Sequence, residues 1–147
     1  MKLVRGDCAF DVDLQRTVTY YEKKGLCDCV GCRNFYAQAR QAFPALNAFL
    51  ADFGVDAGRP DETGWAEDGG EIDYHFAAYT VSGTILKMGK HEIGLWDGAR
   101  LLRIAFGSDY VPNEQTAEHF VITVYGIRLP DKTGERQRKN KKQPEPF

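Results

Sequence analysis

Three of the four cysteines in this chain lie within six residues, at Cys27, Cys29 and Cys32. Thiolates are strong zinc ligands, and the two-residue spacer between Cys29 and Cys32 lets one turn direct both sulfurs at the same ion. Cys8 could supply the fourth ligand from an early strand. The set Cys8, Cys27, Cys29 and Cys32 therefore predicts a structural zinc site, although the sequence holds no second Cys-x-x-Cys pair that would complete a familiar zinc motif.

Two other interpretations of the same cluster stay open. Cys29 and Cys32 stand at an expected helix start, where unpaired backbone N–H groups and the helix dipole favour a thiolate. This predicts a thiol-dependent enzyme or redox sensor, but the alternating strand–helix pattern typical of thioredoxin-like proteins is missing from the sequence. In the third interpretation the cysteines are small apolar side chains packed under the helix, because free cysteine is among the most buried residue types.

The helix that follows the cysteines is the longest helical pattern in the chain. Apolar residues recur at three- and four-residue steps from Phe35 to Phe53, which predicts one principal amphipathic helix over about 32–53. Pro44 lacks a backbone donor, so it predicts either a kink or two short helices with Pro44 in the first turn of the second. Gly54 is a typical C-terminal stop.

Most other segments show strand patterns. Residues 10–21 alternate apolar and polar side chains, which predicts a half-buried strand or two short ones. Asp97-Gly98 predicts a tight hairpin, and Ser82-Gly83 predicts another turn. Further strands are expected at 72–78, 84–87, 91–96, 100–106 and 119–127. The fold class is therefore α+β, a mostly antiparallel sheet that is sandwich-like or strongly curved and carries one principal helix.

Residues 55–71 are the least regular part of the body. They contain four glycines, one proline and six acidic residues around a single Trp65. This composition predicts a long acidic loop, and loops of that length are more often functional or mobile than accidental. The simplest role for Trp65 is to pin the loop to the core.

Other candidate residues carry weaker signals. Three histidines fall in predicted strands, where surface or hydrogen-bonded roles are expected: His75, His91 and His119. The acid pairs Asp61/Glu62 and Glu67/Asp68 would suit catalysis only if the fold brought two carboxylates into one cleft. An aromatic sheet face is expected to be core or to hold a ligand or partner, and it comprises Tyr74, Phe76, Trp96 and Tyr125. The sequence thus favours a binding or interaction module over an enzyme.

Charge divides the chain into a body and a tail. Residues 1–130 hold 13 Lys/Arg against 18 Asp/Glu, whereas residues 131–147 hold 6 against 3. We therefore expect a single α+β domain over 1–130 and a basic, disordered tail over 131–147, because the tail has too few apolar residues to form a core. The acidic body makes nucleic acid an unexpected partner except through the tail, and leaves an unknown protein or small molecule as the expected partner.

The N-terminal residues do not resemble a signal peptide, and no window approaches the roughly 20 apolar residues of a membrane span. The sequence therefore predicts a cytoplasmic protein with no membrane partner. In the cytoplasm thiols are kept reduced, so we expect metal-binding, reactive or buried cysteines rather than disulfides.

The residues from Cys29 to Tyr36, Cys-Val-Gly-Cys-Arg-Asn-Phe-Tyr, resemble a group of small uncharacterised bacterial proteins, as do the following helix and its Gly54-Val55-Asp56 ending. Those proteins carry a Cys-x-x-Cys-basic-Asn-aromatic stretch between a strand region and a similar helix, and continue into a β-rich second half. The likeness covers roughly residues 8–128 and implies a bacterial, cytoplasmic protein. It implies no catalytic role, but it associates Cys29 and Cys32 with Asn34, whose amide is expected to cap or brace the turn.

Overall fold

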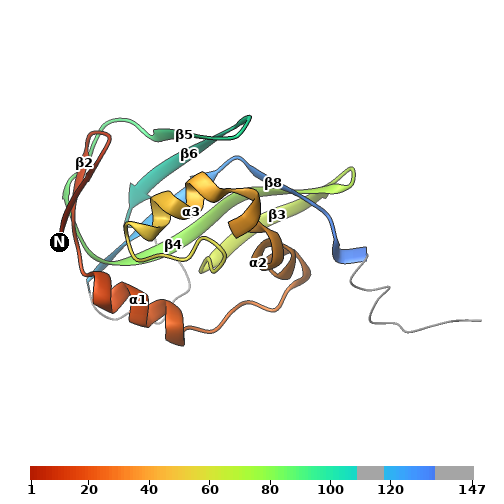
Figure 1. The fold of residues 1–147 in the computed structure, drawn as a ribbon, viewed down its shortest axis with the longest axis horizontal. Helices are drawn as coiled ribbons and strands as arrows, with labels where there is room; N and C mark the ends of the chain where they lie inside the picture. Colours follow the sequence, from red (N-terminus) through yellow and green to blue (C-terminus); the bar gives the residue numbers. More distant parts are fainter. Residues whose placement is uncertain (109–117, 135–147) are drawn as a thin grey trace, which may run out of the picture.

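The computed structural model describes residues 1–108 and 118–134, which form eight strands and three helices (Figure 1). The helices are α1 (Leu14–Lys23), α2 (Val30–Ala42) and α3 (Pro44–Ala51). The strands are β1 (Lys2–Arg5), β2 (Cys8–Val12), β3 (Glu62–Asp68), β4 (Glu71–Lys87), β5 (Ile93–Asp97), β6 (Arg100–Gly107), β7 (His119–Tyr125) and β8 (Ile127–Pro130). The prediction of an α+β fold with a mostly antiparallel sheet is confirmed.

All eight strands belong to one open antiparallel sheet built around the 17-residue strand β4. The main path runs β1-β2-β4-β7-β6-β5. The first half of β4 pairs with β3 on one side and β8 on the other, and its second half pairs with β2 and β7. One long strand therefore connects the N-terminal strands to the C-terminal ones.

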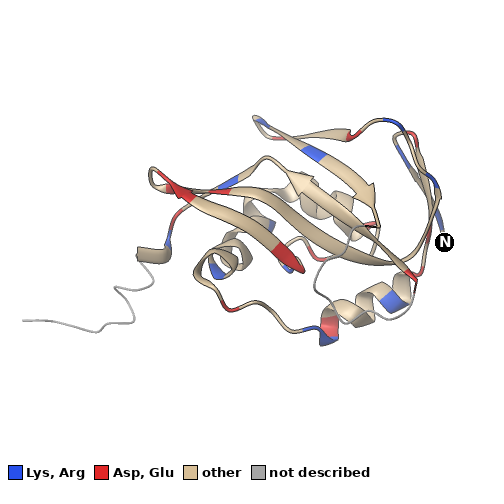
Figure 2. Ribbon diagram, turned by 180° about the vertical axis from the view of Figure 1, so that it is seen from behind, with Lys and Arg blue, Asp and Glu red and all other residues tan. Residues whose placement is uncertain are grey.

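Helices α2 and α3 cover one face of this sheet. Figure 1 shows both helices in front of the strands, and Figure 2, seen from behind, shows the strands in front of them. A group of phenylalanines fills the space beneath α3, with ring centroids 4.6–6.3 Å apart: Phe10, Phe49, Phe53, Phe106 and Phe120. The buried aromatic layer holds α3 on the sheet.

The strand predicted over 10–21 is wrong in its second half, which forms α1. Asp13 ends β2 and caps the helix, because its carboxylate accepts a hydrogen bond of 3.0 Å from the Arg16 N–H. Thr17 and Tyr21, four residues apart, are the buried positions of this helix. The β-branched and aromatic residues of the segment favour a strand, but the Asp13 cap and tertiary contacts such as the hydrogen bond from Tyr21 Oη to Thr80 O prevail.

The single principal helix predicted over about 32–53 is not what forms. The chain makes two helices, α2 and α3, that meet at Phe43, whose ψ of 71° breaks the helical path. Pro44 is the first residue of α3, where its missing N–H costs nothing. Of the two outcomes that Pro44 allowed, two separate helices is the one observed.

The acidic loop predicted over 55–71 is wrong from Glu62 onward. Those residues form β3, which pairs with β4 through a tight turn at Gly69 and Gly70, both with positive φ. Figure 2 shows acidic positions, coloured red on the ribbon, close to this turn. Arg128 of β8 lies within 3.5 Å of three of them, Asp68, Glu71 and Asp73, and so offsets their repulsion.

The turn predicted at Ser82-Gly83 is also wrong, because β4 runs straight through it. Gly83 has a φ of +143° and lies so close to β2 that a Cβ there would stand 2.1 Å from the Asp11 carbonyl oxygen. The glycine serves close strand approach rather than a turn. The hairpin predicted at Asp97-Gly98 is confirmed, with Gly98 and Ala99 as its two loop residues between the paired Asp97 and Arg100.

The predicted strand at 119–127 forms as β7 and β8, separated at Gly126. Residues 109–117, between β6 and β7, and residues 135–147 of the basic tail predicted over 131–147 lie outside the described residues. Among residues 1–108 and 118–134, none of the three helices has the length and apolar character needed to cross a membrane.

Candidate metal centre at the start of α2

The sulfur atoms of Cys27, Cys29 and Cys32 all lie within 4.8 Å of one another. A tetrahedral zinc–thiolate site, with Zn–S bonds of about 2.3 Å, places its sulfurs about 3.8 Å apart. The three cysteines are therefore close enough to hold one metal ion after small side-chain movements. They range from exposed Cys27 through half-buried Cys29 to buried Cys32, so the cluster lies at the protein surface.

The first turn of α2 sets the positions of two of these sulfurs. Cys29 is the N-cap residue, with an extended backbone, and its Sγ accepts the Cys32 backbone N–H at 3.3 Å. The bond takes the place of the hydroxyl or carboxylate oxygen that usually caps a helix. Cys27 lies in the segment between α1 and α2, where its carbonyl accepts a 2.9 Å hydrogen bond from the Tyr36 hydroxyl.

Strand β3 supplies further polar contacts to the sulfurs. The Thr63 hydroxyl lies 3.3 Å from Cys32 Sγ, and the Trp65 side chain lies close enough to the Cys29 thiol to help lower its pKa. Donors around cysteine sulfurs stabilise thiolate character and orient the ligands of metal sites. The structure therefore surrounds the cluster with the type of support that metal-binding thiolates receive.

The two cysteines of the Cys-x-x-Cys pair have opposite electrostatic environments. At Cys29, partial burial raises the thiol pKa, but hydrogen bonds from the Cys32 backbone and from neighbouring side chains outweigh it and the net pKa is lowered. At Cys32 the pKa is raised to about 12, chiefly by burial; the Thr63 hydrogen bond opposes this shift, and the nearby Cys29 and Cys27 add to it. In the metal-free chain Cys29 is thus the more readily ionised thiol.

Gly31 makes a close contact that joins α2 to β3. A Cβ at this position would lie 2.1 to 2.3 Å from the Trp65 indole ring, so only glycine leaves space for the ring. Trp65 packs against the hydrophobic core from β3. This packing agrees with the expectation that Trp65 pins its segment to the core. Trp65 lies against Gly31, in the first turn of α2.

Asn34 braces the same turn, as the resemblance implied. Its side-chain amide donates to the Tyr74 hydroxyl at 3.2 Å and to the Pro130 carbonyl at 3.1 Å, and its carbonyl accepts the Lys132 N–H at 3.0 Å. Tyr74 in turn donates to the Gly31 carbonyl at 2.6 Å. The network ties the start of α2 to β4 and to the end of β8.

Cys8 is not part of the sulfur group. It lies in β2, is buried, and its Sγ accepts the Gly89 N–H at 3.3 Å. The three histidines, all described, are also outside the group. His75 lies 3.8 Å from Asp73, His91 lies 3.2 Å from Asp7, and His119 pairs with Ser82 in the sheet. Every cysteine and histidine of the sequence is therefore located, and the structure brings together only Cys27, Cys29 and Cys32.

Of the acid pairs, Asp61 is engaged by donors from three other residues. Asp61 is almost fully buried and is surrounded by donors: the Tyr20 hydroxyl at 2.5 Å, the Thr80 N–H at 2.9 Å and the Lys24 ammonium at 3.9 Å. Burial lowers the pKa of Lys24, while the charge of Asp61 opposes that shift. The sequence offered no sign of this buried ion pair, because Asp61 falls within the acidic loop predicted over 55–71.

The predicted aromatic face is divided by a bulge in β4. Trp65 pairs with Tyr74 and Gly64 with Phe76, which leaves His75 as an extra residue. Tyr74 consequently points into the main core, whereas Phe76 packs with Ala78 and Val121 in a separate cluster. Trp96 is 64% exposed on β5. Tyr74, Phe76 and Trp96 therefore do not share one surface.

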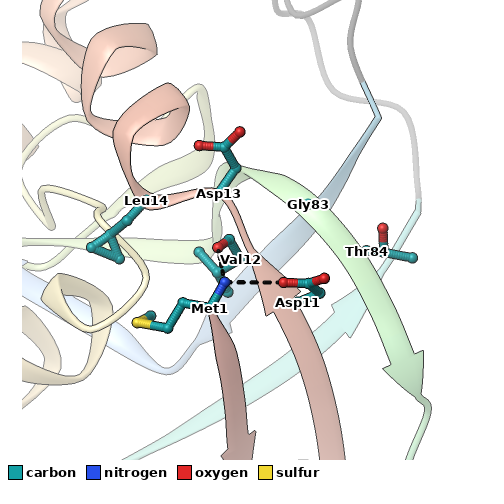
Figure 3. Close-up of a pocket in the computed structure, with 7 residues that line it drawn as sticks. All are labelled: Met1, Asp11, Val12, Asp13, Leu14, Gly83 and Thr84. Carbon is teal, nitrogen blue, oxygen red and sulfur yellow. Dashed lines mark hydrogen bonds and ion pairs between the residues drawn. The ribbon is translucent and has the colours of Figure 1, made fainter.

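Two cavities lie outside the cysteine cluster. One of about 440 Å³ is lined by Met1, Asp11, Val12, Asp13, Leu14, Gly83 and Thr84 (Figure 3). Within it the N-terminal ammonium bonds Asp11 Oδ1 at 3.0 Å and the Val12 carbonyl at 2.9 Å. The other, of about 270 Å³, lies beside α1 and includes Tyr21, Glu22 and Arg59. Neither contains a cysteine.

Comparisons of the chain with protein-family models, with curated proteins and with solved structures give no match. The chemistry of the three cysteines is therefore the basis for a functional proposal.

Proposed function

We propose that this chain is a small binding module whose Cys27, Cys29 and Cys32 thiolates hold a thiophilic metal ion, with zinc the first ion to test. The observation that carries the proposal is the mutual approach of the three sulfurs within 4.8 Å. Soft thiolates favour zinc and monovalent copper over hard cations such as magnesium and calcium.

The role proposed for the ion is structural. Cys27 belongs to the segment that links α1 to α2, and Cys29 and Cys32 belong to the start of α2. An ion bound to all three would fasten the segment to the helix, and binding free energy gained only in the folded chain adds to stability. We propose a binding module rather than an enzyme because hydrogen bonds hold the cysteines in place, whereas none of the described residues is assigned as a general base beside them.

Native mass spectrometry with elemental analysis tests this proposal on the full, reduced chain. We expect one zinc per chain, lost on Cys32→Ser and retained on Cys8→Ser, because Cys8 lies outside the sulfur group. Circular dichroism of each variant checks that the fold persists. A well-folded parent chain that takes up no zinc at micromolar concentration would overturn the proposal.

A second candidate function is thiol redox chemistry by Cys29 and Cys32. The supporting observation is geometric: half-buried Cys29 caps α2 while buried Cys32 lies one turn inside it, and their sulfurs are neighbours. In this scheme the Cys29 thiolate attacks a disulfide of a partner molecule and forms a mixed disulfide. Cys32 then attacks the Cys29 sulfur of that mixed disulfide and releases the partner. The partner disulfide is reduced to two thiols while a Cys29–Cys32 disulfide forms.

Alkylation kinetics distinguish the two functions. Rapid loss of the Cys29 thiol to a Cys29–Cys32 disulfide, with no protection of Cys29 from alkylation by added zinc, would favour redox chemistry. Protection by added zinc, with slow formation of a Cys29–Cys32 disulfide, would favour the metal site.

A further inference from the structure

The cysteine cluster supplies three sulfurs where a structural zinc site normally has four protein ligands. All four cysteines and all three histidines of the sequence are among the described residues. Cys8 and the three histidines lie in other parts of the fold and do not join the cluster. Among the described carboxylates, none joins the group; the nearest in sequence, Asp28, lies 3.8 Å from Arg33. The chain therefore offers a three-sulfur coordination set.

Charge is the second constraint on the ion. Three thiolates around a zinc ion leave one negative charge, and around monovalent copper they leave two. A trivalent ion leaves none. Among the described residues, two cations near the cluster in sequence or space lie close to carboxylates, Lys24 to Asp61 and Arg33 to Asp28. Since Cys32 is buried, an uncompensated charge on the complex carries a desolvation cost that a neutral complex avoids.

We propose that Cys27, Cys29 and Cys32 form a binding site for trivalent arsenic, held as a three-coordinate, neutral trithiolate complex. This inference rests on the proposed metal-binding function and specifies the ion for the same site. Trivalent arsenic bonds three sulfurs in a pyramid and carries a lone pair in the fourth direction, so it requires no fourth ligand. That coordination matches the three sulfurs that the start of α2 brings together.

The binding step balances without an oxidant or a reductant. Arsenous acid, As(OH)₃, reacts with the three thiols: three As–O bonds break and three As–S bonds form. Each thiol proton leaves on a departing hydroxyl as water, and arsenic remains trivalent throughout. Zinc, by contrast, must release the thiol protons to solvent and retains a water or other external ligand in its fourth position.

Two arsenic probes test the sulfur count in the full, reduced chain. Arsenite has three exchangeable oxygens, whereas monomethylarsonous acid has only two. We expect one arsenic per chain with arsenite, and X-ray absorption showing three sulfur neighbours. Cys27→Ser is expected to weaken arsenite binding by at least about tenfold, because loss of a ligand should cost no less than loss of a hydrogen-bond partner of a ligand. The same variant should bind monomethylarsonous acid as the parent does, through Cys29 and Cys32. Cys8→Ser serves as the matched control and should change neither affinity.

The outcomes separate this inference from the proposed function. Displacement of bound zinc by one equivalent of arsenite, with three As–S contacts, supports both. If zinc binds but equimolar arsenite leaves it in place, or if arsenic finds only two sulfurs, the trithiolate inference is overturned and the metal-binding function stands. An equal loss of both arsenic probes on Cys27→Ser also overturns it, since Cys27 would then act through the fold. A folded chain that binds neither zinc nor arsenite contradicts both.

Discussion

Cys8 and Cys32 are both buried cysteines, 2% and 4% exposed, yet they lie in different chemical settings. Cys8 stands alone in β2 and accepts one backbone N–H, from Gly89. Cys32 lies at a helix start beside two other sulfurs, and β3 supplies a hydroxyl to it. Burial alone therefore does not distinguish these two cysteines. The difference comes from topology, because a helix start and the neighbouring strand bring ligands and donors to the same place.

The largest effect is expected from filling the contact that holds α2 against β3. Gly31→Ala puts a methyl group into the Trp65 ring, and overpacking of this kind costs about 3 kcal/mol, more than alanine's gain in helix propensity. Urea unfolding measures the loss. Gly25→Ala is the control, because nothing lies within 4 Å of its added Cβ. Equal stabilities of the two variants would show that the contact does not fix the helix start.

Asn34→Ala should loosen the same region by a smaller amount. The change removes partners from the Pro130 carbonyl and the Lys132 N–H, and lost hydrogen bonds of this kind cost about 2 kcal/mol in total. Hydrogen exchange should speed up both at the start of α2 and at the end of β8. Faster exchange in only one of these segments would contradict the link between them.

Trp65→Phe is expected to weaken metal binding without unfolding the chain. Phenylalanine keeps an aromatic ring against Gly31 but removes the indole group that helps to lower the Cys29 pKa, and loss of such a neighbour lowers metal affinity by about tenfold. Competition with a chelator of known affinity measures the change. Unaltered affinity would indicate that the indole group does not act on the bound ion.

The pH dependence of alkylation separates the two thiols of the pair in metal-free protein. The pKa of Cys29 is below its ordinary value of 9.0, so its modification rate should rise at lower pH than that of a free thiol. The pKa of Cys32 is raised to about 12, so this thiol stays protonated and slow through pH 9. Peptide mass spectrometry after brief iodoacetamide treatment assigns each rate. Equal rates at Cys29 and Cys32 would contradict this assignment.

The smallest effect is expected at Cys8. Cys8→Ala removes a buried sulfur and two weak hydrogen bonds, for a loss of about 1 kcal/mol, with metal content unchanged. Thermal unfolding and elemental analysis measure the two quantities. Loss of metal in this variant would bring Cys8 back as a ligand and remove the contrast with Cys32.

Local patterns predicted much of this molecule. The Asp97-Gly98 hairpin, the helical period after Cys32 and the association of Cys29 with Cys32 are set by neighbours in the sequence. Features that depend on distant partners were missed. The types of Thr17 and Tyr21 favour a strand, but both lie in α1, where they form hydrogen bonds with Ser82 and Thr80 of β4. The close approach of β2 likewise gives Gly83 a role that no local pattern reveals.

The same distinction applies to the candidate site. Spacing alone indicated that Cys27, Cys29 and Cys32 could meet, and the structure brings them within 4.8 Å. The fourth position was the uncertain one, because the location of Cys8 depends on the pairing of β2 with β4 rather than on its own neighbours. The contribution of Thr63 could not be predicted either, since its segment read as a loop.

Zinc K-edge X-ray absorption of the chain loaded with one equivalent of zinc tests the central claim most directly. We expect three sulfur neighbours at about 2.3 Å and one lighter atom that does not come from a cysteine. The spectrum should be unchanged in Cys8→Ser. Four sulfur neighbours in the parent chain, falling to three in Cys8→Ser, or only two sulfurs in both, would contradict a site made by Cys27, Cys29 and Cys32.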